Sequence, residues 1–393
     1  MKFIFVPMAG IYVHIPFCKQ ACAYCNFHFA TSLRYKSELV EAIAAEFELK
    51  KKSIQEQQPL QSIYFGGGTP SLLAANELEK IIRPIQEQIS FNTTPEITLE
   101  ANPDDLSTSY VKDLIKLGIN RLSIGIQSFF EDDLQFMHRA HNASQAEYAV
   151  KAAQDAGIEN ISIDLIYGVP NASEQQWTKN VQRAIELNVP HISAYALTVE
   201  ENTPLYKSIR LKEKSAPIPE STVLQYQILV ELLSNAGFEH YEISNFAKPG
   251  HQAIHNSSYW GGEAYWGLGP SAHSFDGIRR RSWNLPNNQN YIKEIVKGHL
   301  PEEYEILSDI DLYNEMIMIG LRTSKGCNLK VLENKFGSQV RTYFQTQMNQ
   351  AILAENAIQK EDHVFLSSKG HMMADAIMRD AFLTQEDLKL LNR

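Results

Sequence analysis

The chain has 393 residues, of which 44% are hydrophobic and 21% are charged, and its formal net charge is −10. These values are typical of a globular protein with room for two or three domains. The acidic balance disfavours a sequence-independent grip on nucleic acid, which needs a basic face. No apolar run approaches the roughly 20 residues of a transmembrane helix, so we expect no transmembrane segment, while peripheral membrane contact stays open.

The amino terminus faintly resembles a signal peptide, because Lys2 is followed by the apolar residues 3–6. Pro7 interrupts this run, and no small-residue cleavage site precedes the first cysteine. Four cysteines in a long chain are also too few for the disulfide framework of a small secreted domain. We therefore predict a cytoplasmic protein.

Six strand-then-helix units are predicted between residue 10 and about residue 200. The strands lie near residues 11–15, 62–66, 96–101, 121–126, 161–166 and 191–197. Helical patterns fall between them, as where Val40, Ile43, Ala44 and Phe47 share one helical face. Strands that alternate with helices predict right-handed crossovers and a parallel sheet.

Several of these strands alternate between apolar and polar residues. Ile161, Ile163 and Leu165 take one face, while Ser162 and Asp164 take the other. The strands at 11–15, 96–101 and 121–126 show the same pattern. Helices that cover the apolar outer face would turn the polar row inward, unlike the aliphatic layers that fill a closed eight-stranded barrel. We therefore predict an incomplete parallel (β/α) barrel with a polar ligand in its lumen.

Three of the four cysteines, Cys18, Cys22 and Cys25, lie on one short loop after the first strand. Three thiolates can bind three corners of a [4Fe–4S] cluster, which leaves the fourth iron free to hold a small molecule. One alternative is a zinc site completed by His14 or His28. Another is a redox dithiol, although that leaves Cys18 without a role. The residues favour the cluster over both alternatives.

Polar residues lie at the carboxyl ends of three predicted strands, on the lumen side. Glu100, Gln127 and Asp164 share that end of the barrel with the cysteine loop, and barrel active sites are built there. The glycine loop at 66–70 follows the second strand, and its glycines allow close backbone approach to a ligand. It is neither a Walker loop nor a dinucleotide fingerprint. The alternative to a ligand site is a tight turn at the glycine loop, with the strand-end polar residues bound to loop backbone.

The pattern loosens after residue 200. A proline-rich connection at 216–219 leads to a helix at about 221–235 and a strand near 238–243. A polar linker near 284–304 precedes a helix-rich region with a short strand at 362–366, which we predict to be winged-helix-like. We therefore predict a barrel at 1–200, a barrel extension at 201–300 and a smaller carboxyl-terminal domain at 301–393. Cys327 is expected to be a buried small hydrophobic residue.

Several ordered motifs carry a family resemblance. The loop Cys18-x3-Cys22-x2-Cys25, with Tyr24, resembles the radical S-adenosylmethionine (SAM) superfamily, and the glycine loop at 66–70 resembles that superfamily's loop for the methionine amino group. The stretches at 99–103, 123–128 and 164–170 resemble the oxygen-independent coproporphyrinogen III oxidase family. The resemblance covers nearly the whole chain, including the carboxyl-terminal region.

The resemblance implies a set of site residues. Cys18, Cys22 and Cys25 would hold a [4Fe–4S] cluster whose open iron is chelated by the amino and carboxylate groups of SAM. The implied SAM-binding residues are Tyr12, Tyr24, Gly67, Gly68, Thr69, Glu100, Gln127, Arg139 and Asp164. Asp164 would face the ribose. By itself, Arg139 would be interpreted as a solvated loop charge.

Two departures from the oxidase pattern change the expected function. The oxidases carry a further cysteine two residues after the third, where this chain has Phe27, and they have a longer amino-terminal segment. In addition, residues 255–260 resemble the HNxxYW motif of the related HemW haem chaperone family. This resemblance implies that the chain binds haem, with His255 as the axial ligand.

The motif also has a physical interpretation. A neutral imidazole is a common haem-iron ligand. Trp260, Trp266 and Trp283 lie close together in the sequence and could cover a porphyrin face, and the arginines at 279–281 could pair with propionates. Without the resemblance, a core aromatic cluster, a solvated arginine run and a structural histidine are the simpler interpretations.

The leading hypothesis is a chaperone that binds haem and a SAM-ligated cluster and transfers haem to an acceptor protein. An electron donor for the cluster would be a second partner. The alternative is a coproporphyrinogen III oxidase that uses SAM-dependent radical chemistry, although the two departures disfavour an active coproporphyrinogen III dehydrogenase. A structural zinc protein is the third possibility.

Overall fold

The computed structural model describes residues 9–56 and 59–391, so the signal-peptide-like residues 2–7 lie outside the described part. One sheet dominates the fold, with the strand order β12-β11-β10-β9-β1-β2-β3-β4-β5-β6-β8-β7. Its first six strands are β1 (Ala9–Ile15), β2 (Leu60–Gly67), β3 (Phe91–Ala101), β4 (Arg121–Gln127), β5 (Asn160–Tyr167) and β6 (His191–Ala196). Each of them pairs in parallel with the next.

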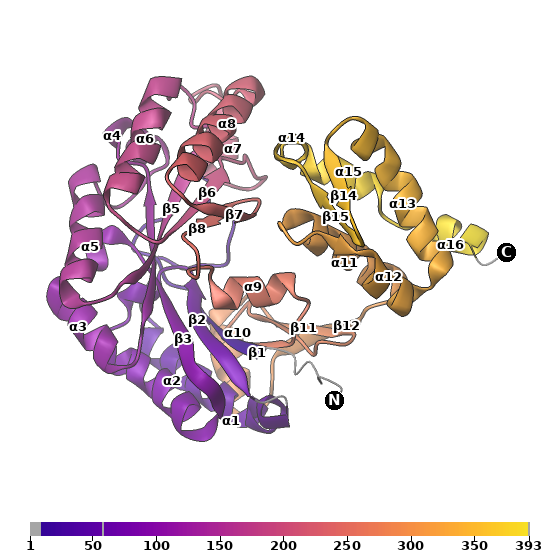
Figure 1. Ribbon diagram of the computed structural model, residues 1–393. Helices are drawn as coiled ribbons and strands as arrows, with labels where there is room; N and C mark the ends of the chain where they lie inside the picture. Colours follow the sequence, from indigo (N-terminus) through magenta and orange to yellow (C-terminus); the bar gives the residue numbers. More distant parts are fainter. Residues whose placement is uncertain (1–8, 57–58, 392–393) are drawn as a thin grey trace.

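The sheet curls around a lumen but does not close, because β12 and β7 are its two ends (Figure 1). The predicted incomplete barrel is therefore confirmed. Its apolar row faces outward, where Ile161, Ile163 and Leu165 are at most 1% exposed. Burying one such side chain contributes about 1.5–3 kcal/mol to folding, which fixes the register and turns the polar row into the lumen.

The middle of the chain supplies strands to both ends of the sheet. The strand β8 (Asn245–Ala247) pairs antiparallel with β6, and β7 (Glu239–Glu242) pairs antiparallel with β8. On the other side, β9 (Tyr265–Leu268) pairs in parallel with β1. It is followed by β10 (His273–Phe275), β11 (Arg280–Asn284) and β12 (Glu302–Ile306), all antiparallel. The first strand of the chain is therefore an interior strand of the sheet.

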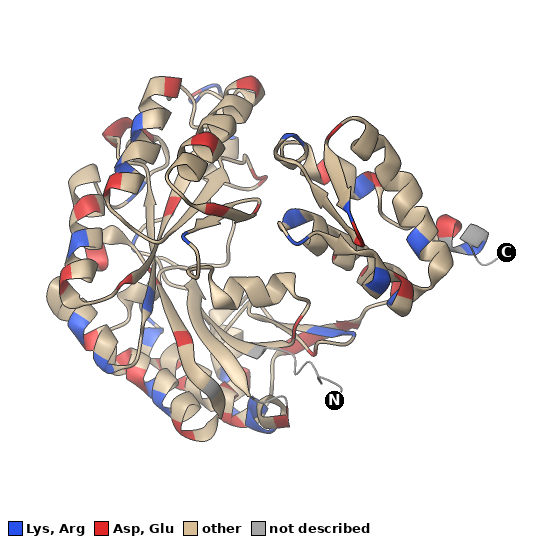
Figure 2. Ribbon diagram, viewed as in Figure 1, with Lys and Arg blue, Asp and Glu red and all other residues tan. Residues whose placement is uncertain are grey.

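Helices cover the outer face of the sheet (Figure 1). The longer ones are α1 (Lys36–Glu56), α2 (Ala75–Gln88), α3 (Thr108–Lys116), α5 (Ala143–Ala156), α6 (Glu174–Glu186), α8 (Pro219–Asn235) and α10 (Asn288–Val296). The shorter ones are η1 (Pro70–Leu72), η2 (Pro103–Asp105), α4 (Glu131–Phe136) and α7 (Pro204–Arg210), whereas α9 (Ile254–Trp260) lies on the inner side of the sheet (Figure 1). Both signs of charge are interspersed along the outer helices (Figure 2). No helix in the described ranges has the length and apolarity needed to cross a membrane.

The carboxyl-terminal region is helical and has its own apolar core. Its helices are α11 (Asp309–Arg322), α12 (Leu329–Phe336), α13 (Ser338–Leu353), α14 (Ser368–His371), α15 (Ala374–Asp380) and α16 (Gln385–Leu391). Its antiparallel sheet has the order β13-β15-β14, formed by Cys327–Asn328, His363–Leu366 and Ala357–Lys360. Cys327 is 2% exposed in this core, as predicted for a small hydrophobic residue.

This region docks on the β7 end of the large sheet. Thr323 forms an antiparallel bridge with Glu242. The backbone N–H of Ile243 donates to the carbonyl of Arg322 at 3.0 Å, and that of Ser324 donates to Tyr241 at 3.0 Å. A short extended segment therefore covers the edge of β7, which would otherwise present unpaired backbone groups.

Candidate functional site

Several contacts fasten the cysteine loop to the mouth of the barrel, and two of them reach the segments that follow β3 and β4. The Ala23 N–H donates to the carbonyl of Met137 at 2.9 Å, which joins the loop to the turn after α4. Lys19 forms ion pairs with Asp104 at 2.6 Å and with Asp105, both in η2. These contacts hold the three cysteines over the carboxyl ends of β3 and β4.

Side-chain donors approach two of the three cysteine sulfurs, and the Phe27 backbone approaches the third, Cys25. The Thr69 hydroxyl donates to Cys18 Sγ at 3.5 Å, and Arg139 Nη1 donates to Cys22 Sγ at 3.1 Å. Burial raises the pKa of Cys18 to about 11 and also raises that of Cys25, whereas Thr69 and Arg139 act in the opposite direction at Cys18. Donors aimed at sulfur favour thiolates, the form that binds iron. This donor set therefore fits a cysteine-ligated iron–sulfur cluster.

The two histidines considered for zinc have other partners. His14 Nδ1 is 3.1 Å from the Tyr12 hydroxyl, and its Nε2 is 3.0 Å from the carbonyl of His28. His28 Nε2 in turn bonds the Asn288 side chain at 2.8 Å. Within residues 9–56 and 59–391, no three His, Cys, Asp or Glu side chains converge closely enough to share a single metal ion such as zinc. A cluster differs in this respect, because its cysteines each bind a separate iron.

Asn102 connects the donors of the two sulfurs, although the sequence did not single it out. Its side-chain oxygen accepts from Arg139 Nη2 at 2.7 Å, and its Nδ2 donates to Thr69 Oγ1 at 3.4 Å. Arg139 also donates to the carbonyl of Gly125 at 2.8 Å and approaches the Tyr24 hydroxyl at 3.5 Å. Arg139 is therefore a half-buried structural member of the site and not the solvated charge that it suggests by itself. In the sequence, Asn102 could have been noticed because it lies between the strand-end Glu100 and a proline.

The glycine loop lies against Glu100. The Glu100 carboxylate accepts from the Tyr64 hydroxyl at 2.7 Å and from the Gly67 N–H at 3.2 Å. Gly67 has φ +107°, and a Cβ there would lie 2.5 Å from the His14 ring. A Cβ on Gly66 would lie 2.9 Å from Glu100 Oε1. Only glycine therefore allows the loop to pack this closely beside the carboxylate.

The lumen carboxylates have raised pKa values. Burial raises the pKa of Glu100 to about 7 and that of Asp164 to about 6, and each value lies well above the ordinary range. Ser123 Oγ donates to Asp164 at 3.4 Å, while the nearby Arg121 favours the ionised form of both acids. Such shifts are common where a carboxyl group awaits a cationic or hydrogen-bonding ligand.

The structure brings the remaining predicted residues to the same mouth. Gln127 has φ +69° and is 9% exposed, and its side chain turns back toward Gly125. Tyr12 stacks on Tyr64 with ring centroids 6.1 Å apart. The Gly68 N–H donates to the carbonyl of Ile15 at 2.9 Å, which ties the glycine loop to β1.

His255 lies deeper in the lumen, on α9. Its side chain is fully buried, with Nδ1 2.8 Å from the Ser62 hydroxyl and Nε2 2.9 Å from the Tyr259 hydroxyl. Burial, with Arg121 nearby, lowers its pKa to about 3, so the imidazole is neutral. Glu96 accepts hydrogen bonds from the first N–H groups of α9, including that of His255 at 3.0 Å. A carboxylate at a helix amino terminus is favourable.

The arginine run is already paired. Arg279 bonds Asp309, Arg280 bonds Glu302 at 3.2 Å and Arg281 bonds Glu305 at 3.4 Å as well as Glu315. Their guanidinium groups are therefore committed to carboxylates, and the predicted pairing with propionates has no support here. These two tryptophans also have separate surroundings: Trp266 is buried beside β1, whereas Trp283 stacks on His273.

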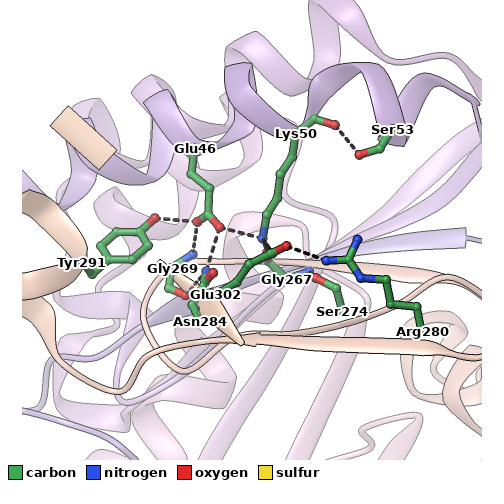
Figure 3. Close-up of polar contacts among 10 residues, drawn as sticks. All are labelled: Glu46, Lys50, Ser53, Gly267, Gly269, Ser274, Arg280, Asn284, Tyr291 and Glu302. Atoms are coloured by element: carbon green, nitrogen blue, oxygen red, sulfur yellow. Dashed lines mark hydrogen bonds and ion pairs between the residues drawn. The ribbon is translucent and has the colours of Figure 1, made fainter. Parts of the chain in front are cut away.

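A buried polar network behind β1 was not predicted from the sequence (Figure 3). The fully buried Glu46 carboxylate accepts from the Gly269 N–H at 2.7 Å, the Tyr291 hydroxyl at 2.5 Å and Asn284 Nδ2 at 2.7 Å. Lys50 lies 2.8 Å from the same carboxylate. The network fixes the turn after β9 against β1, where a Cβ on Gly269 would lie 2.5 Å from the carbonyl of His14.

Comparisons with known proteins agree with this geometry. Residues 12–184 match the Radical SAM superfamily, and residues 307–373 match the HemN C-terminal domain. The chain is 32% identical to the heme chaperone HemW of Lactococcus lactis, over 95% of this chain and 97% of the relative. It is 32% identical to the heme chaperone HemW of Bacillus subtilis, over 96% and 99%. The fold is similar to that of coproporphyrinogen III oxidase (HemN) from Escherichia coli, with a TM-score of 0.82 and 20% identity over 96% of this chain and 90% of that one.

Proposed function

The chain belongs to the radical SAM superfamily and, within it, to the family of the haem chaperone HemW, and on this premise we propose that it binds haem and transfers it to an acceptor protein. The observation that carries the proposal is the position of the HNxxYW segment. Its helix α9 places His255 in contact with Tyr64, which in turn bonds Glu100 at the cysteine end of the barrel. A haem ligand and a SAM site therefore share one lumen.

Cys18, Cys22 and Cys25 would hold the [4Fe–4S] cluster. When it is bound, a SAM-ligated cluster of this type supplies one-electron chemistry. In this proposal Glu100 and the Gly67 loop accept the SAM amino group, Asp164 faces the ribose, and Thr69 and Arg139 direct hydrogen bonds to the cysteine sulfurs that bind the cluster. Tyr12, Tyr24, Gly68 and Gln127 line the rest of the SAM site. An electron donor for the cluster and a haem-accepting protein are the proposed partners, in the cytoplasm.

His255 is the proposed haem ligand. Its neutral imidazole has the protonation state that binds iron. Its Nε2 is already hydrogen-bonded to Tyr259, so iron must replace that bond. Trp260, at the end of the same helix, is the aromatic surface nearest in sequence to cover the porphyrin.

The alternative is an oxygen-independent coproporphyrinogen III oxidase, and the similarity of the whole fold to HemN favours it. Against it, the position of the oxidases' further cysteine is taken by Phe27, which is 69% exposed. A thiol or thiolate at this position is therefore missing. We propose that the chain is not an active coproporphyrinogen III dehydrogenase.

Haem titration of anaerobically reconstituted protein tests the proposal. We expect a stoichiometric Soret shift that His255→Ala abolishes and that His251→Ala, a substitution of the exposed histidine just before α9, leaves intact. The absence of a Soret shift would refute the chaperone proposal. Conversion of coproporphyrinogen to protoporphyrinogen in the presence of SAM and a reductant would establish the alternative.

A further inference from the structure

The helix α7 and the residues that follow it lie directly beside the cysteine loop. The Leu205 N–H, in α7, donates to the carbonyl of Ala23 in the cysteine loop at 2.7 Å. Both residues belong to one small apolar core, which also contains Leu134 of α4. Beyond α7, Lys214 Nζ donates to the carbonyl of Phe136, the last residue of α4, at 2.6 Å. The segment from α7 to Lys214 is therefore part of the barrel mouth, on its cysteine side.

This segment carries positive charge that no carboxylate neutralises. Its four cations, which we call the basic loop, are Lys207, Arg210, Lys212 and Lys214. None of them forms an ion pair within the part of the chain that the structure describes, and Glu213 is the only acid in the sequence from residue 204 to residue 218. The dipole of α7 accounts for Lys207 and Arg210 in its last turn but not for the two lysines beyond it.

Cations on the outer helices are arranged differently. Lys116 of α3, Lys151 of α5 and Arg183 of α6 each pair with a carboxylate. Such exposed pairs contribute little to stability, but they cancel the charge of the cation locally. The chain as a whole has a net charge of −10. A surface with four cations and one acid, next to the cysteine loop, therefore attracts an anionic partner to this end of an acidic protein.

Exposed apolar side chains lie among and beside these cations. Leu211 and Ile218 are 59% and 58% exposed, and Phe27 in the cysteine loop is 69% exposed. Apolar contacts surrounded by a polar rim are the usual anatomy of a protein–protein interface. Small interfaces of this kind are typical of transient encounters between redox proteins. The position beside the cysteines favours such an encounter over a lipid surface, because a cluster must receive its electrons from a carrier that comes close to it.

We propose that the basic loop is the docking surface for an acidic carrier protein that delivers one electron at a time to the cluster. The inference rests on the proposed function, since it takes the three cysteines to hold a [4Fe–4S] cluster. In the transfer the carrier is oxidised by one electron and the cluster is reduced by one, and no bond forms or breaks. The contact of Leu205 with Ala23 joins the docking surface to the cysteine loop. Positive charge at this place steers an acidic carrier to the correct face of the protein.

Flavodoxin, an acidic flavoprotein, is the probe for the test on the cluster-loaded full chain. The Kd of oxidised flavodoxin is measured by biolayer interferometry, and the second-order rate constant of cluster reduction by reduced flavodoxin is measured by stopped-flow absorbance. Both are followed from about 0.01 M to about 1 M salt, over which the Debye length falls from about 30 Å to about 3 Å. We expect the Kd to rise and the rate constant to fall by about 10-fold or more. Constants that do not depend on salt would overturn the inference.

A charge-reversal variant locates the docking surface. Lys207→Glu, Arg210→Glu and Lys212→Glu are combined, since these three side chains are exposed, while Lys214 is kept for its contact with Phe136. At low salt we expect flavodoxin to bind this variant and to reduce its cluster about 10-fold more weakly and more slowly, or worse. The decrease of the rate constant with salt should also disappear.

The matched control has the same change in net charge on the outer helices. It combines Lys112→Glu, Lys151→Glu and Lys179→Glu, which replace exposed lysines of α3, α5 and α6. Its effect on both constants should be much smaller than that of the basic-loop variant. Equal losses in the two variants would show that only the overall charge matters and would overturn the inference.

Dithionite, a small reductant that needs no docking surface, separates this inference from the proposed function. It should reduce the cluster to the same extent in the wild-type protein and in both variants. A wild-type cluster that dithionite reduces, in a protein that flavodoxin does not bind, overturns the inference and leaves the proposed function standing. A wild-type cluster that dithionite does not reduce refutes the one-electron role of the cluster itself. Binding of anionic lipid vesicles, but not of flavodoxin, through the same three cations would make the basic loop a membrane contact and would also overturn the inference.

Discussion

Replacing Glu46 with glutamine should cost much of the barrel's stability. The substitution keeps the size of the side chain but removes its charge, so Lys50, 7% exposed, loses its close anionic partner. It retains Glu302 at 3.5 Å and the carbonyl of Gly267 at 3.1 Å. The new amide also places N–H donors among groups that already donate (Figure 3). Breaking one half of a buried ion pair costs about 3–5 kcal/mol. This is a large fraction of the about 5–15 kcal/mol that stabilises a typical domain.

Urea unfolding of the cluster-free protein, followed by tryptophan fluorescence, measures this effect. At a slope of about 3 kcal/mol per molar urea, the midpoint of Glu46→Gln should fall by about 1 M or more. The double variant Glu46→Gln with Lys50→Met should recover part of the loss, because it also removes the unpaired charge.

Glu48→Gln on the exposed face of the same helix is the matched control. It should change stability by no more than about 0.5 kcal/mol, as most surface substitutions do. Equal midpoints for Glu46→Gln and Glu48→Gln would refute the reasoning. A double variant less stable than Glu46→Gln alone would show that Lys50 stabilises the fold through other contacts.

Three further outcomes are expected. Asn102→Ala should lower the reduction potential of the cluster, because it releases the two donors that approach the cysteine sulfurs, and hydrogen bonds to sulfur raise that potential. The control is Asn120→Ala, which changes an asparagine just before β4 whose side chain accepts from the Ile97 N–H of β3; equal potentials for the two variants would contradict the prediction. SAM should bind more tightly as the pH rises through about 6 to 7. The pKa of Asp164 is raised to about 6 and that of Glu100 to about 7, so both acids are protonated below this range. A SAM affinity that does not change with pH in equilibrium dialysis would argue against their role. Ser324→Pro removes the N–H that donates to the carbonyl of Tyr241. It should speed limited proteolysis between the carboxyl-terminal region and the barrel. An unchanged digestion rate would show that this contact at the edge of β7 is dispensable.

The parallel core and its polar lumen could be predicted because the signals are local. Ser162 and Asp164 alternate with buried isoleucines within one strand, so a few residues decide which face is polar. The same alternation assigned Glu100, Gln127 and Asp164 to the lumen side at the carboxyl ends of their strands. The spacings within the glycine loop and within the cysteine loop are equally local signals. Because both loops follow the carboxyl end of a strand, they were expected at the same end of the barrel.

What the sequence did not reveal depends on distant pairing. Nothing in the short strand β9 indicates that it would pair with β1, some 250 residues earlier, and the burial of His255 depends on that arrangement. The arginines at 279–281 suggested ligand binding because their carboxylate partners lie 20 or more residues away. Glu46 left a weak signal: with Ile43 and Lys50 it shares the buried face of α1, where a charged pair four residues apart is unusual.

The interior position of β1 has a consequence for how the protein is made. β1 emerges first during synthesis, but its second neighbour, β9, follows β2 by about 200 residues, or roughly 10–40 s at about 5–20 residues per second. Throughout this time one edge of β1, next to the cysteine loop, has no native strand to pair with. An open strand edge is a template for wrong association. The nascent chain therefore carries its cysteines on the last part of the barrel to be enclosed, so correct assembly of the iron site depends on the final third of translation.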